Sequence, residues 1–173
     1  AICEYLEEKH PTPPMIGTTP EERAECRMWT RRVDLNICEH MGNGFRFGEG
    51  LKFFEKRIPV APEASPGLKM IAANRLQWLN GQMADGRDYL CGKRFTMADI
   101  LLYGWLDFAA TVGQPLDPAN ANIVAWMARV AERPGLRFRG LLSHAGHAYH
   151  AGSAAELGDI ARLERDTLCG LAD

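Results

Sequence analysis

The sequence of 173 residues lacks a long hydrophobic run, since no apolar stretch approaches the roughly 18 residues that a membrane-spanning helix requires. It also lacks an excess of charge of either sign. Its 20 Lys and Arg face 22 Asp and Glu, which gives a net charge of −2. A nearly neutral chain provides no general electrostatic field for holding polyphosphate. These absences argue against nucleic acid and membranes as partners.

Cysteine is sparse, and its spacing is irregular. The five cysteines are odd in number and include no Cys-x-x-Cys pair: Cys3, Cys26, Cys38, Cys91 and Cys169. This arrangement argues against a disulfide framework and against a structural zinc site. We therefore expect buried, inert thiols in a protein of the reducing cytoplasm.

The composition that remains is that of an ordinary globular protein, with 46 % hydrophobic and 24 % charged residues. The length suits one domain that buries about 70 % of its unfolded surface. The chain begins in a helical pattern, because Ile2, Tyr5 and Leu6 fall at helical spacing and no capping residue precedes them. We therefore expect the natural protein to have sequence upstream of Ala1.

A long helix is predicted to begin after a proline-rich loop. Thr19 is placed to cap it, and Pro20 takes its first position. Its apolar residues recur at helical spacing and form one stripe: Cys26, Trp29, Val33, Ile37 and Met41. Four glycines are expected to loosen or kink its end: Gly42, Gly44, Gly48 and Gly50.

The clearest helix start lies at Phe95. Thr96-x-x-Asp99 is the carboxylate version of a capping box, and Phe95 and Ile100 occupy the two hydrophobic staple positions. A carboxylate committed to a helix N-terminus is a poor proton shuttle, so Asp99 is expected to be structural. Loss of this cap should cost about 1 kcal/mol or more.

The remaining helices have weaker boundary signals. One helix is predicted over residues 67–83, after a proline-rich break. Asp117, followed by Pro118, predicts the start of another helix, which stops near Arg133. A last helix is expected over residues 153–168. Apart from the tetrapeptide YLCG, no alternating pattern predicts a strand, so the fold class is all-α.

Three segments then stand in a fixed order: AICEYLEEKHPTPPMIGTTPEERAECRMWTRRVDL, RDYLCGKRFTMADILLYGWLDFA and NIVAWMARVAERPGL. The first holds a helix, a proline loop and a long helix, the second the capping box, and the third an Asn-x-x-x-Trp helix closed by Arg-Pro. Together they resemble the C-terminal domain of cytosolic glutathione S-transferases. The resemblance covers residues 1–136.

The resemblance implies an all-α, glutathione-transferase C-terminal-like helical bundle over residues 1–136 and a partly helical C-terminal extension over residues 137–173. In that family, an N-terminal thioredoxin-like domain holds most of the glutathione and supplies the catalytic residue. This half is missing from the chain. The resemblance therefore implies glutathione as co-substrate, no metal, and no catalytic residue among those present.

Candidate site residues also follow from the resemblance. Met41 and Phe45 would wall a pocket for a small hydrophobic electrophile, and Tyr103 would offer a phenolic donor. Ordinary core packing is the alternative for Met41 and Phe45. The residues expected at a homodimer interface lie on the long helix: Trp29, Arg31, Arg32 and Asp34. For the charged members, a surface cluster is the alternative.

Two functions are compatible with these features. In the first, the chain joined to a thioredoxin-like half conjugates glutathione to hydrophobic electrophiles and is inactive by itself. In the second, it is a non-catalytic, glutathione-transferase-like helical protein-interaction module.

A histidine run near the C-terminus raises the question of a metal site. On a helix, His144, His147 and His150 would spread over roughly 120°, which is too wide for one ion to bind all three without other ligands. We therefore expect no metal.

Overall fold

The computed structural model describes residues 2–133 and 151–172, with the side chains of residues 151–163 in the second stretch. Every regular element in these stretches is helical, which confirms the predicted all-α class. The tetrapeptide YLCG forms a tight turn with isolated bridges instead of a strand. The chain divides into two units, residues 1–133 and 134–173. Among the described helices, none combines the length and the apolar character needed to cross a bilayer.

The first helix is tied to its neighbours by polar contacts. α1 (Ile2–Lys9) buries none of its residues. Arg27 Nε donates to Glu4 Oε1 at 2.6 Å, which links α1 to the next helix. Glu7 accepts the backbone N–H groups of residues 15 and 16, both at 2.8 Å. The position of α1 therefore depends on two carboxylates.

The predicted long helix begins as expected and then changes its winding. α2 (Pro20–Val33) is capped by Thr19, whose Oγ1 accepts the Glu22 N–H at 3.2 Å. A π-helical turn (Asp34–Cys38) follows and leads directly into α3 (Glu39–Phe47). The predicted apolar stripe faces the core through all three segments, and none of its members is more than 4 % exposed: Cys26, Trp29, Val33, Ile37 and Met41.

The expectation that glycines loosen this helix is wrong for Gly42 and Gly44, which lie buried within α3. A Cβ on Gly42 would lie 2.8 Å from the Trp105 ring, and one on Gly44 would lie 2.9 Å from Lys69. Neighbouring side chains therefore occupy the space that a larger residue would need. The helix ends further on, with Gly48 at its C-terminus.

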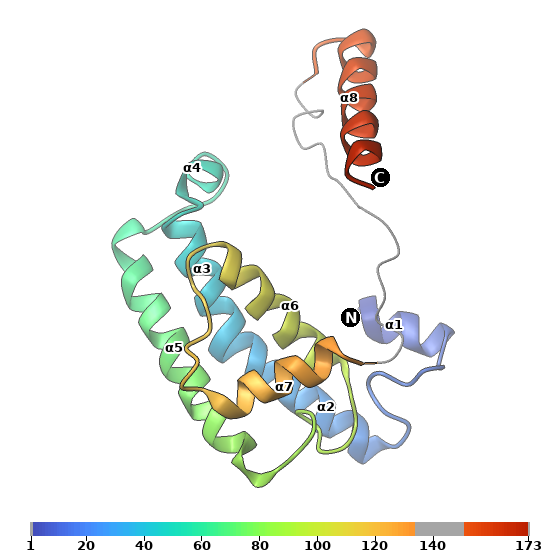
Figure 1. Cartoon of the computed structure of the whole chain (residues 1–173), viewed down its shortest axis with the longest axis vertical. Coiled ribbons are helices and arrows are strands. Elements are labelled where there is room, and N and C mark those ends of the chain that lie inside the picture. The colour runs from blue at the N-terminus through green and yellow to red at the C-terminus, as the bar shows by residue number, and fades with distance from the viewer. Residues whose placement is uncertain (1, 134–150, 173) are drawn as a thin grey trace. The chain divides into compact units, whose positions relative to one another are not determined.

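The remaining helices of the first unit pack around α2 and α3. In Figure 1, α5 runs beside α3, and α6 lies against α2. α7 contacts both α5 and α6. The bounds of these helices are Leu51–Phe54 for α4, Ser65–Gln82 for α5, Met97–Thr111 for α6 and Ala121–Ala131 for α7. In the second unit, α8 (Ala154–Ala172) confirms the predicted last helix and extends it.

α7 begins later than Asp117 and the proline after it predict. Asp117 Oδ1 accepts the Ala119 N–H at 2.8 Å and so closes a turn ahead of the helix. The first turn of α7 is capped instead from α5. Asn80 Oδ1 accepts the backbone N–H groups of residues 122 and 123, at 2.9 and 3.3 Å. A side chain that is distant in the sequence therefore replaces the local cap.

Replacing Gly42 by alanine should lower the free energy of unfolding by about 1–3 kcal/mol, because the added methyl group overlaps the Trp105 ring. Gly104→Ala in α6 is the matched control, since its Cβ would meet no atom within 4 Å. That substitution should stabilise the unit by about 0.5–1 kcal/mol. Urea unfolding measures both. Stabilisation by both substitutions would show that the contact with Trp105 costs nothing.

Candidate functional site

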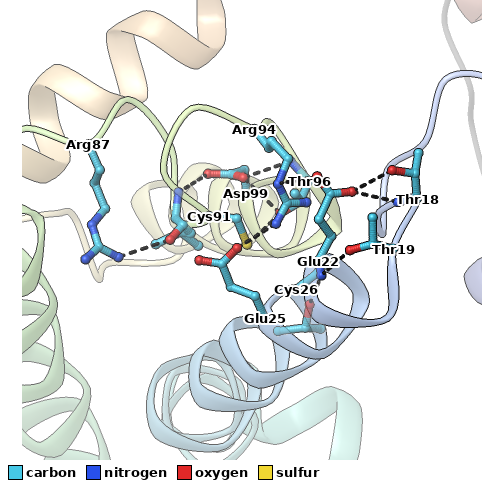
Figure 2. Close-up of polar contacts among 12 residues, drawn as sticks. Thr18, Thr19, Glu22, Glu25, Cys26, Arg87, Cys91, Arg94, Thr96 and Asp99 are labelled. Carbon is cyan, nitrogen blue, oxygen red and sulfur yellow. Dashed lines mark hydrogen bonds and ion pairs between the residues drawn. The ribbon is translucent and has the colours of Figure 1, made fainter.

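The capping box is present at the start of α6 and extends into a buried network (Figure 2). Asp99 has no exposed surface. Its Oδ2 accepts the Thr96 N–H at 2.9 Å. Its Oδ1 accepts the Leu90 N–H and the Trp126 Nε1–H, each at 2.9 Å. Burial raises the pKa of Asp99 even though these donors favour its charged form. Asp99 therefore connects the turn before α6, the start of α6 and α7.

The two predicted staple residues lie in different surroundings. Ile100 is 43 % exposed. The Phe95 ring lies 5.4 Å from the Tyr89 ring, edge to face, and the Arg133 guanidinium lies 4.0 Å from its centre. A direct staple between Phe95 and Ile100 stays a prediction.

Two adjoining cavities lie beside α6, and we call them together the α6 groove. The first, of about 850 Å³, lies between α1, α2 and the start of α6. The second, of about 530 Å³, follows α6. Met97 and Leu101 line both cavities. Ile16 and Met28 add apolar wall to the first cavity, and the second is lined by further residues of α6: Ile100, Gly104, Trp105 and Phe108. A largely apolar hollow of this size suits a small hydrophobic ligand.

Charged side chains border the larger cavity. Arg31 Nη1 lies 3.2 Å from Asp34 Oδ2, and both residues line the cavity. Arg27 and Glu4, the ion pair between α1 and α2, line it as well. Exposed pairs of this kind contribute little to stability. Their charges instead give an apolar hollow a polar rim, which could orient a ligand with a polar end.

The three residues predicted at the substrate pocket, two as its wall and Tyr103 as a donor, line neither cavity of the groove. Met41 is 3 % exposed and belongs to the core. Tyr103 is half-buried, with its ring 6.4 Å from Trp126. Phe45 is half-buried and lies edge to face with Phe108, with the ring centres 5.2 Å apart. Phe45 therefore supports the groove through Phe108.

The residues predicted at a dimer interface separate into a buried and an exposed group. Trp29 is 4 % exposed, and the guanidinium groups of Arg32 and Arg87 lie 5.2 and 5.0 Å from its ring centre. Arg31 and Arg32 are exposed. The interface itself stays a prediction.

The groove residues of α6 were missed by sequence reasoning, although a signal was present. Met97, Leu101, Trp105 and Phe108 recur at helical spacing. A second series on the same helix is buried in the core: Leu102, Leu106 and Ala109. Because α6 has two apolar faces, spacing could not show which face lines a hollow.

Metal ligands are not grouped in the described part of the chain, where no three His, Cys, Asp or Glu side chains could hold one ion. The histidine run at residues 144–150 lies outside the described residues. The expectation of no metal therefore stays a prediction.

The fold and the groove define a class of protein: a helical domain whose sixth helix is anchored by a buried aspartate and lines an apolar hollow. Residues 50–134 match the family description "Glutathione S-transferase, C-terminal domain". These residues therefore correspond to the C-terminal helical domain of the glutathione S-transferase family.

Two curated proteins are similar to most of this chain. Glutathione S-transferase 2 of Saccharomyces cerevisiae is 25 % identical over 139 residues, covering 79 % of this chain and 58 % of the relative. FtsZ-localized protein A of Caulobacter vibrioides is 27 % identical over 143 residues, covering 79 % of this chain and 60 % of the relative.

A solved structure, a glutathione S-transferase domain-containing protein of Marinobacter aquaeolei, superimposes with a TM-score of 0.66 at 32 % identity. The match covers 78 % of this chain and 65 % of that structure. The chain thus spans roughly three fifths of the length of the two named curated relatives.

Proposed function

We propose that this chain is the hydrophobic-substrate and dimerisation domain of a glutathione S-transferase-like enzyme. Joined to a thioredoxin-like half, it would conjugate glutathione to small hydrophobic electrophiles. The α6 groove is the observation that carries the proposal, because its apolar wall and its volume suit such a substrate.

The chemistry divides between the two halves. The other half would bind glutathione and stabilise its thiolate, which attacks the electrophile. The side chains of the groove would remove the electrophile from water and hold it in position for attack. Holding the electrophile in the correct orientation would lower the barrier of the reaction. Arg31 and Asp34, at the rim of the larger cavity, would meet the more polar end of a bound molecule. No residue of the described chain is proposed to transfer a proton.

Leu101→Ala should lower kcat/KM for a hydrophobic electrophile about tenfold or more, because Leu101 lines both cavities. The KM for glutathione should not change. The assay uses the longest form of the protein isolated from its source, with the 173-residue chain as an inactive reference. Val124→Ala is the matched control, since Val124 is 43 % exposed on α7 and lines neither cavity.

The second candidate, a non-catalytic interaction module, is favoured by the likeness to FtsZ-localized protein A, a relative named for its localisation. Intact mass and conjugation assays separate the two candidates. A source protein that includes a thioredoxin-like half and conjugates electrophiles supports the enzyme. A protein of 19.2 kDa, or a longer one that conjugates nothing, supports the module.

A further inference from the structure

Two cysteines from distant parts of the sequence meet in the interior of the first unit. Cys26 lies on α2 and Cys91 on the turn before α6 (Figure 2). They are 1 % and 3 % exposed, and both are free thiols. Both thiols lie beside the Thr96 hydroxyl, whose Oγ1 is 3.5 Å from Cys91 Sγ, and the two thiols interact with each other. Spacing along the chain does not predict this pair, because α2 and the turn come together only in the fold.

Cys26 is surrounded mainly by hydrogen-bond donors. It hydrogen bonds the Thr96 hydroxyl and the Ala98 N–H, at the N-terminus of α6. The Thr30 hydroxyl lies 3.9 Å from its Sγ. The Met15 carbonyl, at 3.8 Å, is the opposing acceptor. The hydrogen bond from Cys91 and these donors lower the pKa of Cys26 below its ordinary value.

Cys91 has the opposite character. Its Sγ lies 3.5 Å from Thr96 Oγ1, and its hydrogen bond to Cys26 together with burial raises its pKa. The negative charge of Glu25 acts in the same direction. Cys26 is therefore the more acidic thiol of the pair, and Cys91 is the one that retains its proton when the pair ionises.

Cys26 can be approached from the α6 groove. It lines the larger cavity, together with Ile16, Met97 and Leu101. The sulfur has almost no exposed surface, so a bulky disulfide reagent would be excluded and a small oxidant would be admitted.

We propose that Cys26 and Cys91 are an oxidation site that closes to an intramolecular disulfide in the presence of hydrogen peroxide. The Cys26 thiolate attacks one peroxide oxygen, the O–O bond breaks, and the departing hydroxide takes up a proton to become water. Cys91 then attacks the sulfur of the resulting sulfenic acid, its own proton leaves with the hydroxyl group as a second water, and the S–S bond forms. Two thiols and one peroxide thus give one disulfide and two waters.

The disulfide would act on the start of α6. Leu90, the neighbour of Cys91, donates its N–H to Asp99, and Thr96 contacts both the thiol pair and the carboxylate. Oxidation would therefore link the turn covalently to α2, next to the capping box.

The test treats the reduced 173-residue chain with hydrogen peroxide, alkylates the remaining thiols and maps the peptides by mass spectrometry. We expect a cross-linked peptide pair containing Cys26 and Cys91, lighter by two hydrogen masses than the two separate peptides. Cys38 is an internal control, because burial raises its pKa to about 12, so peroxide should leave it as a thiol that is alkylated once the treated chain is unfolded in denaturant.

Two variants test which cysteines form the cross-link. Cys91→Ser should abolish the cross-link and leave Cys26 as a sulfenic acid that dimedone traps when the treated chain is unfolded in denaturant. Cys3→Ser, which removes the other cysteine lining the larger cavity, should leave the cross-link intact. A disulfide between Cys26 and Cys3 would overturn the proposal. So would a map in which the exposed Cys3 is oxidised while Cys26 and Cys91 both remain thiols. The peptide map of the wild-type chain tests the proposal even if a variant fails to fold.

Discussion

Asp99→Ala is expected to lower the free energy of unfolding of the helical domain by at least about 3 kcal/mol. The substitution leaves three buried donors without an acceptor, the N–H groups of Leu90 and Thr96 and the Nε1–H of Trp126. Each unsatisfied buried donor costs about 1–3 kcal/mol. This exceeds the loss expected for a helix cap because the carboxylate also bonds the preceding turn and α7. Urea unfolding followed by circular dichroism measures the change.

Asp107→Ala is the control, because Asp107 is exposed on the same helix. It should change stability by less than about 0.5 kcal/mol. Equal losses for the two variants would contradict the buried network.

Asp99→Asn adds a test of charge, since burial raises the pKa of Asp99 above its ordinary value of 3.8. Protonation of Asp99 then contributes to the free energy of unfolding below pH 3.8, and this contribution is lost as the pH rises through the raised pKa of the folded state. The stability difference between wild type and Asp99→Asn should therefore narrow as pH rises.

Trp29→Ala is expected to lower the free energy of unfolding by about 3–5 kcal/mol, the usual cost of removing a buried large aromatic side chain. Trp29 is 4 % exposed and joins α2 to α5 through Trp78, whose ring centre lies 6.5 Å away. The Arg87 guanidinium, 5.0 Å from the ring centre, adds a contact from the turn after α5. Thermal or urea unfolding measures the loss.

The partner ring provides the comparison for Trp29. Trp78 is 38 % exposed, so Trp78→Ala should cost about 1 kcal/mol. Protein concentration separates a core role for Trp29 from the predicted interface role. A core residue gives the same loss at every concentration, whereas an interface residue gives a loss that follows dimer dissociation. A loss that shrinks when the chain is diluted below its dimerisation constant would favour the interface.

Local signals predicted the helices that carry their own boundary residues. Thr19 and Pro20 start α2 as expected, and the Thr96 and Asp99 box starts α6. These predictions hold because a cap and its helix are neighbours in the sequence. α7 shows the limit, since its first turn is capped by Asn80 of α5. A cap of that kind depends on how two helices pack, and no pattern within α7 reveals it.

The candidate site was less predictable than the fold. Apolar spacing identified Met41 as an inward residue, but it could not distinguish a core position from a pocket wall. The groove instead uses the second apolar face of α6, including Leu101 and Trp105. Which face of a helix borders empty space depends on the size of the neighbouring side chains. The contact between Cys26 and Cys91 could not be predicted for another reason, because the two residues are distant in the sequence and meet only in the fold.

The π-helical turn (Asp34–Cys38) lets the long helix accept an additional residue without changing which side it buries. The Glu39 N–H bonds the Asp34 carbonyl, a span one residue longer than in an α-helix. Trp29 and Met41 are 41 − 29 = 12 positions apart, whereas about 11 positions complete three α-helical turns. The wider turn takes up the difference. In evolution, a deletion of one residue here should convert the π turn to α winding and leave both buried side chains in place.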